Sequence, residues 1–484
     1  MKKHAKREKL SSGIKGLDEI LSGGFLESNS YLITGGPGNG KTTFCLHFLE
    51  EGSKNGEPCL FITLGEKEEQ IRKNAGKLGL KLENVHFLDL SPSSKFFIEM
   101  EYYDIFSPAE VEREPVTQAI KEKVEALKPK RVVIDSMTHF RYLATDVFQF
   151  RRQVLSFLRF LTENGATVLF TAEASVEAPD SDLRFLADGI IELSFSEIGR
   201  QLEVKKYRGS EYLSGQHYYE IKNGCGIVVF PRLLPTEKKI NINFEKLSSG
   251  IPEIDELLYG GIESGTVTII SGPSGTGKTT LGLQFIKEAS GRGERSVVYT
   301  FEESVEKIVE RALSINIPIK NMIDKGTLEI KKIEPLIYTP YSFAQLVKED
   351  VEKRNTKIVM IDSTSGYKLS VRGAEITTHL HALCKYLNNQ GVTVFLPTEI
   401  KKITGEFQIA QEDISYLADN VIILRYIEIK GELRRAIGVL KKRLGDFEKN
   451  LREFQITKYG IKVGEPLKNM RNILSGAPSF IEET

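Results

Sequence analysis

The chain has 484 residues, with 66 Lys and Arg balanced by 66 Asp and Glu, so its formal net charge is zero. This balance gives no general attraction to nucleic acid or to an anionic membrane. With 40% hydrophobic and 27% charged residues, the composition is typical of a globular protein, and at roughly 100–200 residues per domain the length predicts several domains.

Neither secretion nor membrane insertion is indicated. The N-terminus is basic but has no apolar stretch of the kind a secretion signal needs, and no run approaches the ~18 apolar residues of a membrane span. The four cysteines, Cys45, Cys59, Cys225 and Cys384, are scattered without CxxC spacing, which argues against a disulfide framework and against a zinc site. We therefore expect a cytoplasmic protein whose cysteines are reduced core residues and which has no membrane partner.

An internal repeat sets the domain organisation. Shifting the chain by 237 positions places residues 9–43 on residues 246–280, and 18 of these 35 positions are identical. A repeat this long indicates a duplicated globular domain rather than a solenoid, whose units are roughly 20–50 residues long. We predict a first domain over residues 1–235 and a second over residues 236–484.

Each copy alternates β-rich runs with helical stretches, which predicts an α/β fold with a mostly parallel sheet flanked by helices. The expected strands are residues 31–34, 59–64, 131–135 and 167–172 in the first copy and 267–271, 296–301, 357–362 and 392–397 in the second. Their near-continuous apolar character is typical of strands buried on both faces. Runs of β-branched residues after Asp188 and Asp419 predict a further hairpin in each domain.

The first strand of each copy leads into a glycine-rich segment, GGPGNGKT at residues 35–42 and GPSGTGKT at 272–279, followed by a helical stretch. Both match the GxxxxGK[ST] P-loop, in which backbone N–H groups surround phosphates at a helix N-terminus. Lys41 and Lys278 would reach the β- and γ-phosphates, and Thr42 and Thr279 would offer a hydroxyl to Mg²⁺. A chance glycine turn is the alternative. The residues expected to bind ATP or ADP through these loops are Gly35, Pro37, Gly38, Asn39, Gly40, Lys41, Thr42 and Thr43, and Gly272, Ser274, Gly275, Thr276, Gly277, Lys278, Thr279 and Thr280.

Acidic residues end two more strands of each copy. Asp135 and Asp362 each follow a buried apolar strand, which is the Walker B position that holds Mg²⁺; an Asp that caps the next turn is the alternative. Glu302 and Glu303 end the second strand of the second copy and could accept a proton from an attacking water, although an acid pair can also cap a helix. In the first copy Gly65 takes the place of Glu302. We therefore expect the second domain to dominate hydrolysis.

Basic residues recur late in each copy, in EVKKYRGS and GVLKKRLGD. Alternate residues of a strand project from one face, so Lys206 with Arg208, and Lys441 with Arg443, would each present two cations together. A solvated surface is the alternative, but recurrence in both copies favours contact with a γ-phosphate across a subunit boundary. The predicted nucleotide-contacting segments are Lys206, Tyr207 and Arg208, and Lys441, Lys442 and Arg443.

Together these motifs resemble the KaiC family of tandem RecA-like P-loop ATPases over almost the whole chain. The resemblance rests on SSGIxxxDE before each P-loop, TFEE, the IDS acid, the KxR pairs and residues 416–443. It implies a two-tiered homo-hexamer with ATP between subunits, ATP hydrolysis and, in some members, serine/threonine autophosphorylation in the second tier. Carried over by motif, Glu302 and Glu303 would be the catalytic acids of the second domain, with Glu302 also near Mg²⁺, and Glu66 would be the remaining acid of the first.

The sequence departs from the circadian members of that family. They carry adjacent Ser and Thr at the phosphoacceptor stretch, whereas here Ser415 is followed by Tyr416. Ser415 is a candidate phosphoacceptor, with a serine that caps a turn as the alternative. The tail after Ile473 does not resemble the segment that circadian partners engage. We expect an ATPase with an unidentified signalling partner rather than an oscillator.

Two other functional classes remain open from the sequence. A RecA-like or replicative-helicase-like DNA motor shares the P-loop core, and the basic segment from Lys2 to Lys9 would support it, but zero net charge and the duplicated domain count against it. A nucleotide-locked scaffold is the other, suggested by Gly65 in the first domain. Aromatic residues between the second and third strands of the first copy could dock a partner or pack an inserted hairpin. These are Phe96, Phe97, Tyr102, Tyr103 and Phe106.

Overall fold

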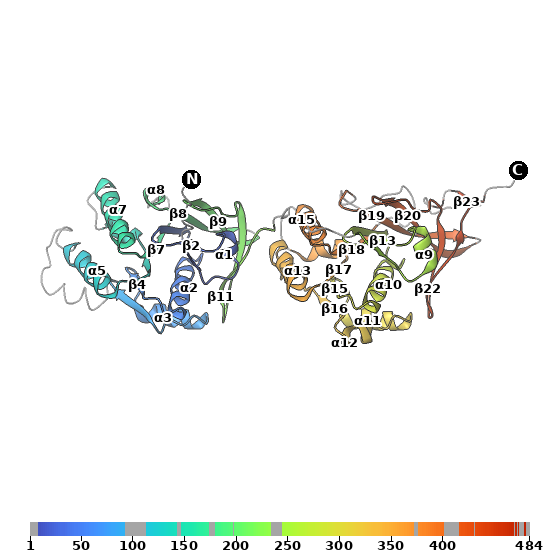
Figure 1. The fold of residues 1–484 in the computed structure, drawn as a ribbon, viewed down its shortest axis with the longest axis horizontal. Coiled ribbons are helices and arrows are strands. Elements are labelled where there is room, and N and C mark those ends of the chain that lie inside the picture. The colour runs from blue at the N-terminus through green and yellow to red at the C-terminus, as the bar shows by residue number, and fades with distance from the viewer. Residues whose placement is uncertain are drawn as a thin grey trace, which may run out of the picture. The chain divides into compact units, whose positions relative to one another are not determined.

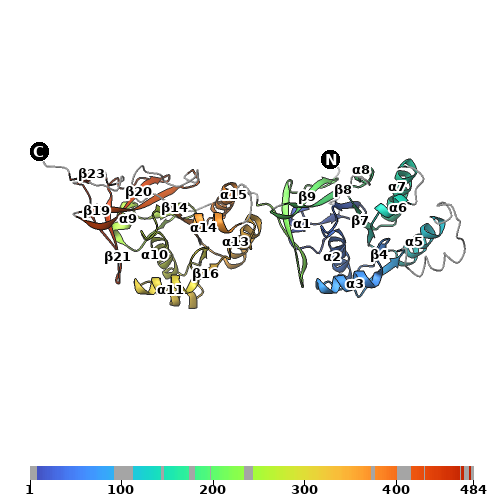
Figure 2. The ribbon, with the colours of Figure 1, turned by 180° about the vertical axis from the view of Figure 1, so that it is seen from behind.

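A computed structural model describes residues 8–91, 113–142, 147–173, 180–196, 198–233, 244–371, 376–400, 416–429, 431–468, 470–471, 473 and 479–480. The chain divides into two compact units, Met1–Arg232 and Leu233–Thr484, which we call the first and the second unit (Figures 1 and 2). The boundary predicted between residues 235 and 236 lies outside the described residues. The same is true of Ser415 and of the five aromatic residues from Phe96 to Phe106.

A nine-stranded sheet forms the centre of the first unit. Its strand order is β11-β10-β9-β8-β3-β7-β6-β4-β5. The strands are β3 (Ser30–Gly35), β4 (Cys59–Thr63), β5 (Val85–Asp89), β6 (Arg131–Asp135), β7 (Thr167–Glu173), β8 (Gly189–Ser196), β9 (Gly199–Tyr207), β10 (Gln216–Lys222) and β11 (Gly226–Phe230). The strands from β8 to β5 in this order pair in parallel, whereas β8, β9, β10 and β11 pair antiparallel.

Helices cover both faces of this sheet. They are α1 (Leu17–Ile20), α2 (Lys41–Lys54), α3 (Glu68–Lys77), α5 (Arg113–Leu127), α6 (Thr138–Tyr142), α7 (Val147–Glu163) and α8 (Ser181–Leu186), and a two-stranded ribbon pairs β1 (Lys9–Leu10) with β2 (Phe25–Leu26). Helices α1, α2 and α3 pack on the face that carries Tyr31 and Phe61. Helices α5 and α7 pack on the opposite face, which carries Leu32 and Ile62. This alternation places two apolar cores on the two sides of one sheet.

The second unit repeats this arrangement strand for strand, in the order β16-β15-β17-β18-β14-β19-β20-β21-β22. Its sheet consists of β14 (Val267–Gly272), β15 (Ser296–Thr300), β16 (Leu328–Lys332), β17 (Ile358–Asp362), β18 (Thr393–Glu399), β19 (Asn420–Ile429), β20 (Glu432–Lys442), β21 (Arg452–Thr457) and β22 (Gly460–Pro466). Its helices are α9 (Pro252–Leu257), α10 (Lys278–Gly291), α11 (Val305–Ser314), α12 (Ile319–Asp324), α13 (Pro340–Arg354), α14 (Thr364–Ser370) and α15 (Ile376–Asn389). Two short ribbons pair β12 (Lys246–Leu247) with β13 (Ile262–Glu263), and β23 (Met470–Arg471) with β24 (Ser479–Phe480).

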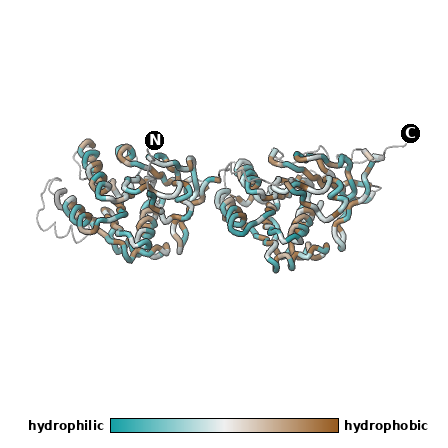
Figure 3. The backbone as a smooth tube through the Cα atoms, in the orientation of Figure 1, coloured by the Kyte–Doolittle hydropathy of each residue, from teal (hydrophilic) through white to brown (hydrophobic). Residues whose placement is uncertain are grey.

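The predicted fold class is confirmed: each unit has a mostly parallel sheet flanked by helices. Every residue of β4 and of β15 is buried, as the apolar sequence of these strands predicts. Among the parallel strands, the prediction omits β5 and β16, which lie at the sheet edge and mix polar with apolar residues. Edge strands of this kind lack the continuous apolar run by which a buried strand is recognised. The helices alternate hydrophilic and hydrophobic segments (Figure 3), as helices with one buried face do.

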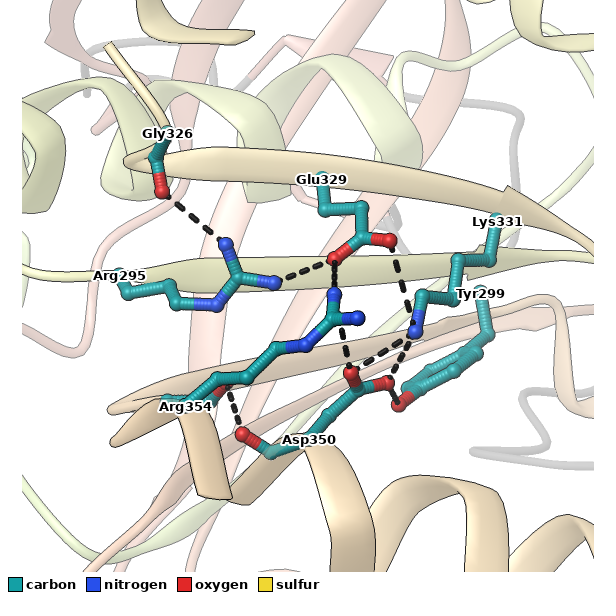
Figure 4. Close-up of polar contacts among 8 residues, drawn as sticks. Arg295, Tyr299, Gly326, Glu329, Lys331, Asp350 and Arg354 are labelled. Atoms are coloured by element: carbon teal, nitrogen blue, oxygen red, sulfur yellow. Dashed lines mark hydrogen bonds and ion pairs between the residues drawn. The ribbon is translucent and has the colours of Figure 1, made fainter. Parts of the chain in front are cut away.

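A network of charges joins the edge of the second sheet to α13 (Figure 4). Asp350 of α13 accepts hydrogen bonds from the Tyr299 hydroxyl at 2.5 Å and from Lys331 Nζ at 2.6 and 2.8 Å. Glu329 lies 3.5 Å from Lys331 Nζ and also pairs with Arg295 and Arg354. Burial, and then the hydrogen bond to Asp350, raise the pKa of Tyr299 far above its ordinary value.

The positions of Tyr299 and Lys331 are apolar in the first unit. The strand pairing of Tyr299 with Lys331 corresponds there to the pairing of Ile62 with Leu88, and both side chains belong to the core beside α5 and α7. The contacts of Tyr299 and Lys331 with Asp350 therefore have no counterpart at Ile62 and Leu88, and in the second unit the members of the network hold β15, β16 and α13 together.

The cysteine prediction is correct for Cys45, Cys59 and Cys384, which are buried free thiols, and wrong for Cys225, which is exposed. Cys225 lies in the turn between β10 and β11, where only three residues separate the two strands. Within the described residues, no helix combines the length and the hydrophobicity needed to cross a membrane.

Candidate functional site

Both glycine-rich loops leave a central strand at its C-terminal end and lead directly into a helix. The first connects β3 to α2, and the second connects β14 to α10. The last glycine before each lysine has left-handed backbone angles, with φ of 86° at Gly40 and 105° at Gly277. A Cβ there would also lie 2.8 Å from Ile221 Cδ1 or 2.5 Å from Ile456 Cδ1. The left-handed backbone favours glycine at both positions, and a side chain there would also displace an isoleucine methyl group.

Side chains within the two loops form hydrogen bonds that hold the shape of each loop. Asn39 donates from Nδ2 to the Leu193 carbonyl at 2.9 Å, and Thr276 donates from Oγ1 to the Pro273 carbonyl at 2.8 Å. These side chains are buried, so their contribution to a ligand is through the loop backbone. The N–H groups at the start of α2 and α10 carry the positive end of each helix dipole, which is suited to anions.

The two P-loop lysines bend back onto their own loops. Lys41 Nζ donates to the carbonyls of Gly35 at 2.9 Å and Gly36 at 3.1 Å, and Lys278 Nζ donates to the carbonyl of Pro273 at 2.8 Å. Burial lowers the pKa of both lysines, and neighbouring carboxylates oppose this effect. A phosphate group beside either lysine would favour its charged form further, because an opposite charge stabilises an ammonium group.

The hydroxyl after each lysine meets the Walker B aspartate. Thr42 Oγ1 donates to Asp135 Oδ2 at 2.6 Å, and Thr279 Oγ1 donates to Asp362 Oδ2 at 2.7 Å. Burial raises the pKa of Asp362 to about 6, against the lowering effect of the hydrogen bond from Thr279. A hydroxyl beside a carboxylate is the oxygen donor set that Mg²⁺ takes in P-loop sites. The described residues contain no group of three or more His, Cys, Asp or Glu side chains that could hold a metal, so a bound Mg²⁺ would complete its shell with phosphate and water.

In the second unit these residues line a cavity of about 480 Å³, a size typical of small-molecule sites. Its lining includes Lys278, Thr279, Glu302, Glu303 and Asp362 from the sequence prediction. It also includes residues that the sequence analysis did not single out, namely Thr300, Arg311, Ile315, Ser363, Glu399, Arg435 and Ile456. Thr300, Glu399, Arg435 and Ile456 belong to β15, β18, β20 and β21, Arg311 and Ile315 lie in or next to α11, and Ser363 follows β17. Only the fold brings them to the P-loop.

The two acids of the second unit have different partners. Glu302 Oε1 accepts a hydrogen bond from Ser363 Oγ at 2.9 Å, whereas Glu303 Oε1 forms an ion pair with Arg311 at 2.6 Å. Ser363 directly follows Asp362 and therefore fixes Glu302 against the end of the Walker B strand. Glu302 is thus held beside Asp362, while Glu303 is engaged with α11.

In the first unit the same turn is kept without the first acid. Thr63 Oγ1 donates to the backbone carbonyl of Glu66 at 2.5 Å, as Thr300 Oγ1 does to that of Glu303 at 2.9 Å. The backbone path is therefore shared, and the difference between the two sites lies in the side chains.

In each unit the recurring cation pair lies at one end of the sheet, and the P-loop of the same unit lies at the other end. Tyr207 pairs with Gly189, which pairs with Tyr31 near the start of β3, whereas the P-loop follows the end of β3 at Gly35. Likewise Lys441 pairs with Val421, at the start of β19. Burial and then the charge of the neighbouring Arg lower the pKa of Lys206 and of Lys441.

The residue between the two cations is wrong as a nucleotide contact in both units. Tyr207 is 7% exposed, stacks on Tyr31 and donates its hydroxyl to the Gly24 carbonyl at 2.5 Å. Lys442 is 8% exposed and lies 3.1 Å from Glu263. Successive side chains of a strand point to opposite faces, so these two face the core when their neighbours face outward.

Comparison with known proteins agrees with this geometry. The family model for the KaiC ATPase matches the chain twice, over residues 10–233 and 247–468. The circadian clock oscillator protein KaiC of Prochlorococcus marinus is 30% identical over 491 residues, which cover 98% of this chain and 96% of that protein. The circadian clock protein KaiC3 of Synechocystis sp. is 28% identical over 493 residues, covering 99% of this chain and 96% of that protein. With both units matched by the family model, the chain belongs to the KaiC family of ATPases.

Proposed function

We propose that this chain is a Mg²⁺-dependent ATPase that works as a homo-hexameric ring, with ATP bound between neighbouring subunits. The observation that carries the proposal is the position of the cation pairs, which face outward at the far end of the sheet from the P-loop of their own unit. Such cations can serve a phosphate only if it is held by another subunit. Repeated head-to-tail contacts of this kind close into a ring, and six subunits is the number that the resemblance to the KaiC family implies.

Within the second site, each residue has a distinct task. Lys278 would leave the Pro273 carbonyl to contact the β- and γ-phosphates, and Thr279 with Asp362 would hold Mg²⁺. Bound Mg²⁺ would neutralise charge on the phosphates. Glu302, oriented by Ser363, would accept a proton from the attacking water. Lys441 and Arg443 of the neighbouring subunit would stabilise the charge that develops on the γ-phosphate.

A subunit-mixing experiment tests the shared site. One variant, Lys278→Ala, lacks the P-loop lysine, and the other, Lys441→Ala with Arg443→Ala, lacks the cation pair. Each alone should lose the part of ATP hydrolysis that Glu302→Gln removes from the unmodified protein. Rings assembled from equal amounts of the two variants should recover about one quarter of that hydrolysis, because one interface in four combines an intact P-loop with an intact cation pair. Retention of full activity by the cation-pair variant alone, or no recovery in the mixture, would contradict the proposal.

Assembly should also depend on nucleotide, because a ligand shared across a boundary stabilises the assembled state by mass action. Light scattering at micromolar protein should report the ring with saturating Mg²⁺ and ATP. A monomer under these conditions would exclude the interface.

We further propose that Ser415 is a site of autophosphorylation. The support is that only the second unit offers a hydroxyl at this place, since the first has Arg184 there, and that the second unit alone has Glu302. Arg184 of the first unit forms ion pairs with Asp180 and Glu192. Incubation with Mg²⁺ and labelled ATP, followed by intact-protein mass spectrometry, should show one phosphate on the unmodified chain and none on Ser415→Ala. Equal labelling of both, or no labelling of either, would remove Ser415 as the acceptor.

A further inference from the structure

In each nucleotide site a functional side chain faces a glycine across the same gap. The two units differ in which side of the gap carries the side chain and which carries the glycine. In the second unit the side chain belongs to Glu302, at the end of β15, and the glycine is Gly366, in α14. In the first unit the glycine is Gly65, after β4, and the side chain belongs to His139, in α6. His139 lies four residues after Asp135, and Gly366 lies four residues after Asp362, so the two occupy matching places in their units; Figure 2 labels both short helices.

The exchange is a matter of space. A Cβ on Gly366 would lie 3.0 Å from Glu302 Oε1 and 2.8 Å from Phe301 Cβ. A Cβ on Gly65 would lie 3.0 Å from His139 Nε2. In each contact one functional side chain reaches toward a glycine, and a Cβ on that glycine would crowd the side chain. In the first unit the imidazole extends from α6 toward the loop after β4, and in the second unit the carboxylate extends across the matching gap from the loop after β15 toward α14.

The chemistry of the two groups is equivalent in one respect. A carboxylate and the unprotonated nitrogen of a neutral imidazole can both accept a proton from water, and histidine is the side chain most often used for this purpose. His139 is exposed, so water can reach it. Its helix begins three residues after Asp135, which itself accepts the hydrogen bond from Thr42, so the segment that carries His139 starts at the end of the Walker B strand.

We propose that His139 is the water-activating residue of the first nucleotide site, in place of the carboxylate that Gly65 removes. In the proposed step His139 Nε2 takes a proton from water while the water oxygen forms a bond to the γ-phosphorus. The bond from that phosphorus to the β,γ-bridging oxygen breaks and leaves on ADP, and the imidazolium then gives its proton to solvent. The first site is on this account a hydrolytic site rather than a store of ATP. The inference rests on the proposed binding of ATP by the first P-loop.

The test uses the full-length chain with Glu302→Gln and Glu303→Gln, so that the remaining hydrolysis reports the first site. In this background His139→Gln, which keeps a polar side chain of similar length but is not a base, should lower kcat by about 10²–10⁴-fold with KM changed only a few-fold. His139→Gly should do the same. A turnover that survives either change would contradict the proposal and would leave Glu66 as the acid of the first site.

The exchange variant separates catalysis from packing. Gly65→Glu with His139→Gly rebuilds the arrangement of the second unit and should recover turnover by at least about tenfold over His139→Gly alone. Gly65→Glu with His139 retained should have a lower turnover than the exchange variant, because the two side chains crowd each other. If the exchange restores nothing, or if His139→Gln is fully active, the imidazole has only a packing role and the proposal is wrong.

Nucleotide binding is measured in the same variants with a fluorescent ATP analogue. Each variant then also carries Lys278→Ala, so that binding reports the first site. Unchanged affinity in His139→Gln with lost turnover is the expected pattern. Absence of binding in the His139-containing protein would instead refute the proposed function of the first site, which keeps the two failures distinguishable.

Discussion

Asp350→Asn should loosen the outer edge of the second sheet without affecting the first unit. Asp350 is 2% exposed and is bound by Tyr299 and Lys331. Removing one partner of a buried ion pair costs about 3–5 kcal/mol, because the other charge stays buried without compensation. Here the lower end applies, since Lys331 keeps Glu329 at 3.5 Å and the asparagine oxygen can still accept a hydrogen bond. We therefore expect a loss of about 3 kcal/mol.

Hydrogen exchange followed by mass spectrometry measures this loss locally and does not require the two units to unfold together. A loss of about 3 kcal/mol corresponds to exchange about two orders of magnitude faster, confined to peptides of β15, β16 and α13. The matched control is Arg354→Ala, because Arg354 joins the same network through a side chain that is 53% exposed, and exposed pairs contribute little. Equal effects of the two substitutions, or exchange in Asp350→Asn within threefold of the unmodified protein, would refute the reasoning.

Three further outcomes follow from single contacts. Lys442→Met should destabilise the second unit by about 3–5 kcal/mol in chemical denaturation because it leaves a buried carboxylate unpaired, whereas Lys441→Met should not; equal losses would show that the core assignment is wrong. Gly366→Ala should lower hydrolysis at the second site at least about tenfold with nucleotide affinity kept, because the added methyl group displaces Glu302; unchanged turnover would contradict the position of that carboxylate. At pH 8 an alkylating reagent should label Cys225 alone in the native chain and all cysteines after unfolding, because burial raises the pKa of the other three thiols, in two cases to about 12; rapid native labelling of a second thiol would show that the cores are open.

Much of the site follows from the sequence because its parts are local. The P-loop glycines, the lysine and the hydroxyl residue are neighbours in the chain, and the Walker B aspartates are marked by the apolar strands that precede them. Both Asp135 and Asp362 then meet the threonine of their P-loop, as the order of parallel strands requires.

What the sequence analysis missed depends on contacts between distant segments. His139 lies 74 positions after Gly65, and neither residue suggests the other. A signal existed, however, in the comparison of the two repeats: Gly65 aligns with Glu302, and His139 aligns with Gly366 at a slightly different offset. The pairing of these two exchanges becomes visible only when the fold places β4 beside α6 and β15 beside α14.

The prediction that the middle residue of each cation segment contacts nucleotide failed for a different reason. Tyr207 and Lys442 belong to the same short motifs as their neighbours, but strand geometry turns them to the other face. Their polar groups are satisfied inside the unit, so composition gives no sign of their burial.

The central claim is that each unit holds one nucleotide at its own P-loop. Equilibrium binding of Mg²⁺ and a slowly hydrolysed ATP analogue to the full-length chain tests this claim most directly. The account predicts two nucleotides per chain, reduced to one by Lys41→Ala and to one by Lys278→Ala. A single nucleotide in the unmodified chain, or a lysine substitution that leaves the stoichiometry at two, would contradict it.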